Sequence, residues 1–180
     1  MASKIKVDQI QTADGTGTIA LQNQLSGMTT ASLPALGSAQ MPTGSVLQVV
    51  QDVDTVRTIV ASTTFVATSK TQTITPSSTS SKILVFCNYN INDNTASDVT
   101  AYTTIYRGST NIGHSTFGIG KLRATASRVE TSHTIMYLDS PASTSEQTYT
   151  LYARGTTTDS FEFPGNPGQH NTITLMEIAG

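Results

Sequence analysis

The stretch KILVFCNYNI, residues 82–91, decides how the chain folds. Leu84 and Phe86 fall on one face of this stretch, and the alternate positions form the other face. That second face carries Ile83, Val85, Cys87, Tyr89 and Ile91. Alternation with a period of two is typical of a β-strand. Because apolar residues occupy both faces at first and one face later, we expect a strand that is covered on two sides at its start and on one side at its end.

The composition of the whole chain favours strands over helices. Its 180 residues include 32 Thr, 20 Ser and 13 Gly, and only 12% of them are charged. β-Branched residues favour strands, whereas Lys, Glu and Arg favour helices. Short strand signals recur after residue 44 at the spacing of a sandwich or jelly roll, so we predict an all-β chain with a jelly-roll-like β-sandwich at residues 45–180. The expected strands are residues 45–51, 57–61, 71–75, 82–91, 99–107, 132–138, 147–153, 160–163 and 171–178.

The closing stretch, residues 171–178, is also apolar on two faces. Ile173 and Leu175 point one way, and Met176 and Ile178 point the other. Five Phe, six Tyr and no Trp make a thin core for a monomer. We therefore predict that one face of this strand packs in the subunit core and that Met176 and Ile178 contact neighbouring subunits of a homotrimer.

Residues 1–28 have strand-like spacing but too few apolar side chains to form a core. Two short alternating patches flank the turn-forming Asp14-Gly15 pair. An isolated two-stranded arm is marginally stable at best, so we expect this arm to fold by docking on other subunits. Residues 29–44 contain Pro34 and Pro42 and no sustained period, which predicts a linker. The residues expected to dock are Ile5, Val7, Ile10, Ile19 and Leu21.

A pattern runs through the arm: Lys-x-x-x-Ile, then Asp-Gly-x-Gly, then a short apolar strand. It is carried by Lys6, Ile10, Asp14, Gly15, Gly17, Ile19 and Leu21. This pattern resembles the N-terminal attachment segment of tail-fibre and related appendage proteins of tailed bacteriophages, especially marine phages. The stretches GSVLQVVQ (44–51), YLDSP (137–141) and ITLMEIAG (173–180) resemble strands of the distal domains of the same appendages.

The resemblance implies a virion protein that is assembled in the host cytoplasm. It implies that residues 1–28 bind other tail or capsid proteins and that the distal domain attaches to a host-surface glycan or protein. In trimeric fibre tips of this kind the first and last strands lie side by side near the threefold axis. The resemblance therefore implies that residues 45–51 pair with residues 171–178.

Few residues suggest a chemical site. The run 88–94 holds four Asn and one Asp but lacks the Gly and Glu of a calcium loop, so we interpret it as a polar strand end. Tyr89, Asn90 and Asn92 are the candidate receptor contacts, because an aromatic face and amides suit a sugar. The three histidines, His114, His133 and His170, are too far apart in sequence for a zinc motif, although a trimer axis could gather three copies of one.

Other function classes lack their sequence signals. A net charge of −2 with scattered basic residues argues against nucleic-acid binding. No apolar run is long enough for membrane insertion, no signal peptide is evident, and a single cysteine, Cys87, excludes an internal disulfide. We expect no enzyme, catalytic residue, metal or cofactor. Two alternatives stay open: a capsid-decorating or collar fibre protein that stabilises the particle without a receptor, and a polysaccharide-degrading spike.

Overall fold

The computed structural model describes residues 37, 40–93, 98–125, 128–164, 166 and 168–180. The predicted arm, residues 1–28, and most of the predicted linker, residues 29–44, lie outside these residues. The expected docking residues Ile5, Val7, Ile10, Ile19 and Leu21 are therefore also outside the described part. Residues from Gly37 to Gly180 form one compact unit.

All elements of the described residues are strands. They are β1 (Val46–Asp54), β2 (Thr58–Val60), β3 (Val66–Ile74), β4 (Lys82–Asp93), β5 (Val99–Arg107), β6 (Thr110–Asn111), β7 (Gly120–Ala124), β8 (Val129–Asp139), β9 (Gln147–Gly155), β10 (Phe161–Phe163) and β11 (Asn171–Ile178). The prediction of an all-β chain is confirmed.

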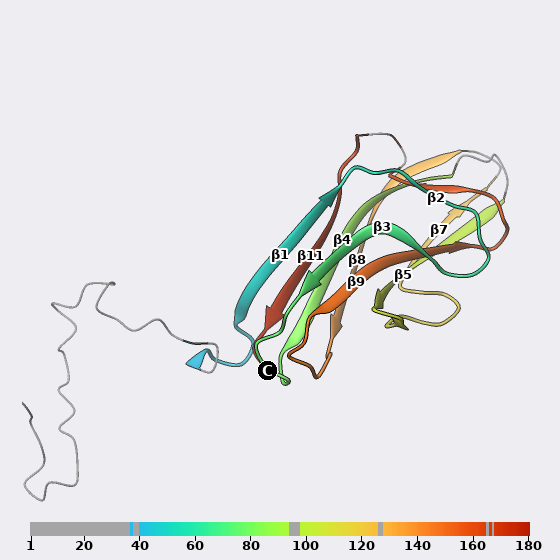
Figure 1. The fold of residues 1–180 in the computed structure, drawn as a ribbon. Helices are drawn as coiled ribbons and strands as arrows, with labels where there is room; N and C mark the ends of the chain where they lie inside the picture. Colours follow the sequence, from blue (N-terminus) through green and yellow to red (C-terminus); the bar gives the residue numbers. More distant parts are fainter. Residues whose placement is uncertain (1–36, 38–39, 94–97, 126–127, 165, 167) are drawn as a thin grey trace, which may run out of the picture. The chain divides into compact units, whose positions relative to one another are not determined.

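The strands form two antiparallel sheets, as Figure 1 shows. The first sheet has the order β1-β11-β4-β10-β2, and β8 pairs with the other edge of β4. The second has the order β3-β9-β5-β6, and β7 also pairs with β5. Buried side chains from both sheets, such as Val85 and Leu151, belong to one hydrophobic cluster. The sheets therefore pack face to face, as in a β-sandwich.

The core-facing side of β4 carries the five alternating apolar residues that run along the whole stretch 83–91. Ile83, Val85, Cys87, Tyr89 and Ile91 are each at most 1% exposed. Full burial stabilises a large apolar side chain by about 1.5–3 kcal/mol relative to water. Burial also raises the pKa of the Cys87 thiol to about 12, which keeps it protonated and unreactive. The opposite face is less enclosed: Leu84 is half-buried and Phe86 is 38% exposed.

All nine expected strands exist: β5 and β11 have the expected ends, the other seven have shifted ends, and two further strands were missed. The missed strands are β6 and β7. In β7 the exposed side chains are Lys121 and Arg123, and the strand begins at a glycine. It lies at an edge of the second sheet, where charged residues are tolerated and the alternating apolar signal is weak.

The first and last strands pair along their whole length, from Val46 opposite Ile178 to Asp54 opposite Asn171. The pairing implied by the phage resemblance is thus confirmed. Beyond the ladder, the Gly44 N–H donates to the Ala179 carbonyl at 2.8 Å. We call the end of the sandwich where Gly44 meets Ala179 the base, and the opposite end, where β4 finishes at Asp93, the distal end.

Candidate functional site

The outer face of the first sheet carries a row of apolar side chains across four strands. Val49 in β1 lies opposite Met176 in β11, which lies opposite Leu84 in β4, which lies opposite Leu138 in β8. In the next row toward the distal end, Phe86 lies opposite Met136. We call this surface the apolar face, and it consists of Val49, Leu84, Phe86, Met136, Leu138 and Met176.

Three side chains of the apolar face are about half exposed. Val49 is 54% exposed, Met136 57% and Leu138 49%. Single exposed apolar residues are ordinary, but an ordered group of them on one sheet face marks an interaction surface. Within the described residues, no layer of this chain covers them.

The same sheet face becomes polar toward the distal end. The Gln51 amide donates to the Thr174 hydroxyl at 2.7 Å, and the Asn88 amide donates to the Thr134 hydroxyl at 3.0 Å. Further along, the Ser132 hydroxyl donates to the Asn90 side-chain oxygen. The apolar side chains are therefore concentrated in the half of the sheet that lies nearer the base, and Val53 of β1, 48% exposed, is an isolated apolar residue further along.

The two faces of β11 are arranged as the sequence predicted. Ile173 and Leu175 are in the core, at 1% and 0% exposure. Met176 and Ile178 point outward and are half-buried within the single chain. Whether these two side chains contact another subunit stays a prediction.

Sequence reasoning missed most of the apolar face. Val49, Met136 and Leu138 contribute more exposed apolar surface than β11 does, and none was singled out. The signal was present in β8, where Met136 and Leu138 alternate with Ile135, which is in the core, and with Tyr137, which lies opposite the core residue Val85 and is 38% exposed. Their alignment with Val49 depends on strand register, which the sequence of one strand does not contain.

The prediction that Tyr89 and Asn92 contact a receptor is wrong. Tyr89 is 1% exposed, and its hydroxyl shares a 2.6 Å hydrogen bond with the Thr103 hydroxyl in the core. Burial raises the pKa of the Tyr89 phenol, and the hydrogen bond with Thr103 offsets only part of this rise. Asn92 is fully buried. Its side-chain amide donates to Glu162 and its side-chain oxygen accepts from Arg128, so both polar ends are satisfied within the chain. Asn90 is half-buried, and its role as a contact stays a prediction.

Arg57, Glu162, Asn92 and Arg128 form a charged cluster at the distal end. The Arg57 guanidinium pairs with the Glu162 carboxylate, whose side chain is only 5% exposed. Because the buried acid has a cationic partner and an amide donor, we interpret the cluster as structural.

The three histidines lie in different places. His133 stacks on Tyr89 within the sandwich, and burial lowers its pKa. In the β6–β7 connection, His114 accepts hydrogen bonds from the Thr116 and Phe117 N–H groups. The carbonyl of His170 accepts from Asn90. No group of three His, Cys, Asp or Glu side chains that could hold a metal occurs among the residues that the structure describes.

The sequence matches no protein-family model and no curated protein. Across the described part of the chain, no helix combines the length and the apolar character needed to cross a membrane. The apolar face is thus the feature from which a function can be argued.

Proposed function

We propose that this chain is a structural protein of a tailed-phage virion, a tail-fibre-like appendage that assembles as a homotrimer and attaches the particle to the host surface. The apolar face carries this proposal. Its row of four aligned apolar side chains belongs to an interface, because water contact with so many of them is unfavourable by roughly 25 cal/mol for each Å². The resemblance of residues 6–21 to phage attachment segments supplies the virion context.

We propose further that the sandwich is a jelly roll. Its eight longer strands give the order β1-β11-β4-β8 in one sheet and β3-β9-β5-β7 in the other. In chain order these are first-eighth-third-sixth and second-seventh-fourth-fifth, which is the arrangement of two interleaved Greek keys. The short strands β2, β6 and β10 add to the edges.

The proposed trimer places the apolar face of each subunit toward the threefold axis. The base then faces the virion, because residue 44 enters β1 there and the arm precedes it. The distal end and the outer face of the second sheet stay open to the host. Three copies facing one cell raise the effective concentration of each weak contact, so that modest single-site affinity gives firm adhesion.

The experiment is to sediment the purified full-length chain and to compare particles with and without it. We expect a species near three times 19.0 kDa, and particles without the chain should lose host adsorption while they stay intact. A clean monomer at micromolar concentration would contradict the trimer. A dimer would also contradict it and would indicate that two subunits pair through the same surface. Particles that adsorb normally but break more readily would support the capsid-decorating alternative instead. Release of reducing ends from host polysaccharide would support the spike alternative.

A further inference from the structure

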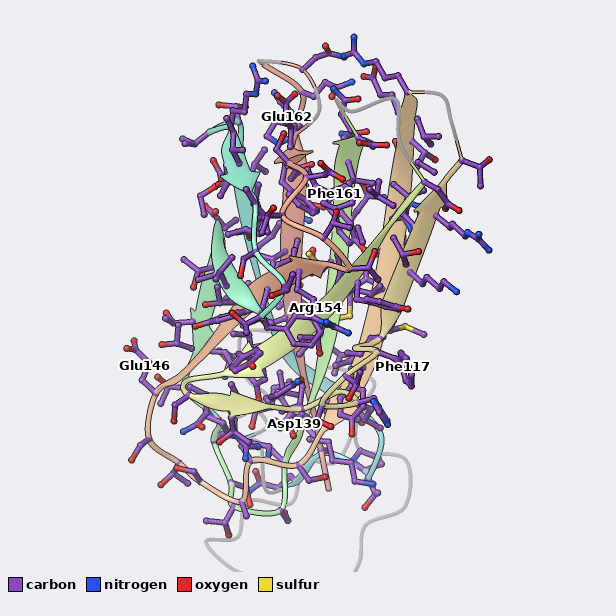
Figure 2. The ribbon with its side chains drawn as sticks, turned by 90° about the vertical axis from the view of Figure 1, so that its right-hand side faces the viewer. Phe117, Asp139, Glu146, Arg154, Phe161 and Glu162 are labelled. Atoms are coloured by element: carbon purple, nitrogen blue, oxygen red, sulfur yellow. The ribbon has the colours of Figure 1, made fainter. Side chains whose placement is uncertain are left out.

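The outer face of the second sheet holds a cluster of aromatic side chains around one arginine. Tyr102 and Tyr106 come from β5, Tyr152 and Arg154 from β9, and Phe65 precedes β3. Phe117, in the β6–β7 connection, extends the cluster. Figure 2 shows Arg154 on the sheet face turned toward the viewer, with Phe117 to its right. We call these six residues the aromatic–arginine surface.

The aromatic rings of this surface pack against one another and stay partly exposed. The Tyr106 and Tyr152 rings stack with centroids 3.8 Å apart, and Phe65 meets Tyr106 edge-on at 6.5 Å. Phe117 is 56% exposed and lies 5.7 Å from the ring of Tyr102. Five of the chain's eleven Phe and Tyr residues are thus on this surface rather than in the core.

Arg154 is fixed in place by backbone carbonyls and rings. Its Nε and one Nη donate to the Thr116 carbonyl, at 2.9 and 2.6 Å, and the other Nη donates to the Thr63 carbonyl at 3.0 Å. The guanidinium carbon lies 4.9 Å from the Tyr102 ring centre and 5.6 Å from that of Phe65. A guanidinium has five N–H donors, so two are left for a ligand.

No carboxylate among the described residues neutralises Arg154. The ion pairs of this part of the chain join Arg57, Lys70, Arg107 and Arg123 to acids elsewhere. Lys121, opposite Tyr102 on the same sheet face, adds a second cation without an ion pair in the described part. The surface therefore combines flat apolar rings with uncompensated positive charge, which suits a ligand that is both ring-shaped and anionic.

A shallow hollow of about 330 Å³ opens beside the guanidinium. It is lined by Thr63, Thr64, Phe65, Tyr106, Ser115, Thr116 and Arg154. Four of the seven lining residues are Thr or Ser and a fifth, Tyr106, carries a phenolic hydroxyl, and the volume is at the lower end of the roughly 300–1,000 Å³ range of ligand sites. A space of this size accepts one or two small rings rather than a folded partner, which needs about 800 Å² of surface.

We propose that this hollow binds a saccharide ring that carries a carboxylate. The ring packs on Phe65 and Tyr106, its hydroxyls contact the Thr and Ser side chains, and its carboxylate pairs with the two remaining N–H groups of Arg154. The inference rests on the proposed attachment function and deepens it, since it names the ligand class and moves the contact from the buried Tyr89 to the opposite sheet. A nucleic acid is disfavoured because its phosphates need clustered cations along a strand.

The test measures binding of the purified full-length chain to oligosaccharides bearing uronate, N-acetylneuraminate or pyruvate-acetal groups. Neutral oligosaccharides of equal length serve as the ligand control, on an array and then by calorimetry. We expect the acidic set to bind and to weaken as salt rises, because exposed charge pairs are screened. Arg154→Gln should weaken binding by about tenfold or more, since it removes a charge-assisted hydrogen bond.

Ser115 provides a matched pair of variants, because it lines the hollow and is exposed, and the hydrogen bonds of Arg154 go to Thr116 and Thr63 instead. Ser115→Asp puts a repelling carboxylate at the rim and should also weaken binding by about tenfold, while the isosteric Ser115→Asn should stay within about twofold. These variants keep the test valid even if Arg154→Gln disturbs the loop that Arg154 holds.

Three sugar-binding results would overturn the proposal: equal binding of neutral and acidic sugars, binding of neither, or unchanged affinity in both Arg154→Gln and Ser115→Asp. Capture of a host-surface protein with no acidic sugar bound would replace the ligand class and overturn it too. Particles carrying Ser115→Asp separate this inference from the proposed function. If they adsorb normally while particles without the chain do not, attachment stands and the contact lies elsewhere on the chain.

Discussion

Substitution of Met136 by Asp tests the apolar face most directly. Met136 is 57% exposed, so a single subunit loses little: exposed substitutions of this kind usually change the free energy of unfolding by about 0.5 kcal/mol or less. Full burial of a Met side chain is worth about 1.5–3 kcal/mol, and roughly half of it is available for assembly. A buried, unpaired carboxylate costs several kcal/mol more. The sum is about 4 kcal/mol or more for each subunit, which raises the trimer dissociation constant by about a thousandfold or more for each of the three subunits.

The assay is sedimentation velocity over a concentration series, with circular dichroism and thermal unfolding of the same samples. Met136→Asp should keep its β spectrum but sediment as a monomer. Phe117→Asp is the matched control, because Phe117 has nearly the same exposure, 56%, in the β6–β7 connection beside the second sheet, and the variant should stay trimeric. Leu175→Asp, in the core, should instead fail to fold. If Met136→Asp sediments as the unchanged chain does, the apolar face is not the interface.

Three further predictions concern stability, each measured by urea unfolding. Lys70 is 1% exposed and pairs with Asp54 at 2.6 Å, so Asp54→Asn leaves a buried ammonium unpaired and should cost about 3–5 kcal/mol at pH 7; a loss below about 1 kcal/mol would show that the pair is dispensable. Burial raises the pKa of Glu177, but hydrogen bonds from Ser77 and Gln48 lower it by more, so the pKa is below its unperturbed value of 4.5. The stabilisation from Glu177 is therefore present above pH 4.5 and lost as the pH falls through the folded-state pKa, and Glu177→Gln should remove that part of the pH dependence; an unchanged profile would contradict this. Gly118 has φ +64°, and a Cβ there would lie 2.2 Å from a backbone carbonyl oxygen, so Gly118→Ala should cost about 1–3 kcal/mol and loosen the β6–β7 connection, which limited proteolysis would detect; equal stability and protection would refute the strain.

The strands and the core face of β4 could be predicted because their signal is local. Alternation in residues 82–91 depends only on neighbouring residues, and five apolar side chains on the Tyr89 face against two on the other already indicated which face is buried. Tyr89 was nevertheless assigned to a receptor contact, so the same count could have corrected that assignment. The burial of Asn92 could not be foreseen, because it depends on Glu162 and Arg128, which are distant in sequence.

Both candidate surfaces depend on register between strands, which the sequence does not state. The apolar face exists because Val49, Met176, Leu84 and Leu138 lie at matching positions of four strands. The aromatic–arginine surface likewise needs β5 beside β9. Within each strand the sequence shows which residues share a face. Tyr102 and Tyr106, like Tyr152 and Arg154, are an even number of residues apart and so lie on the same side of their strand. Only the pairing of the strands shows that these sets meet.

The β1–β11 ladder also determines how the domain bears tension. A pull through the residues before Gly44 reaches β1 at the base, while a ligand on Arg154 would hold the molecule near the distal end of β9. Such a load runs along β1, and the hydrogen bonds between β1 and β11 are perpendicular to this direction. All of these hydrogen bonds therefore share the load when β1 is pulled past β11. A pull between Gly44 and Gly180 would instead open the same ladder from the base, one bond after another. We therefore expect the domain to resist tension applied between Gly44 and Arg154 and to open more easily under tension applied between Gly44 and Gly180.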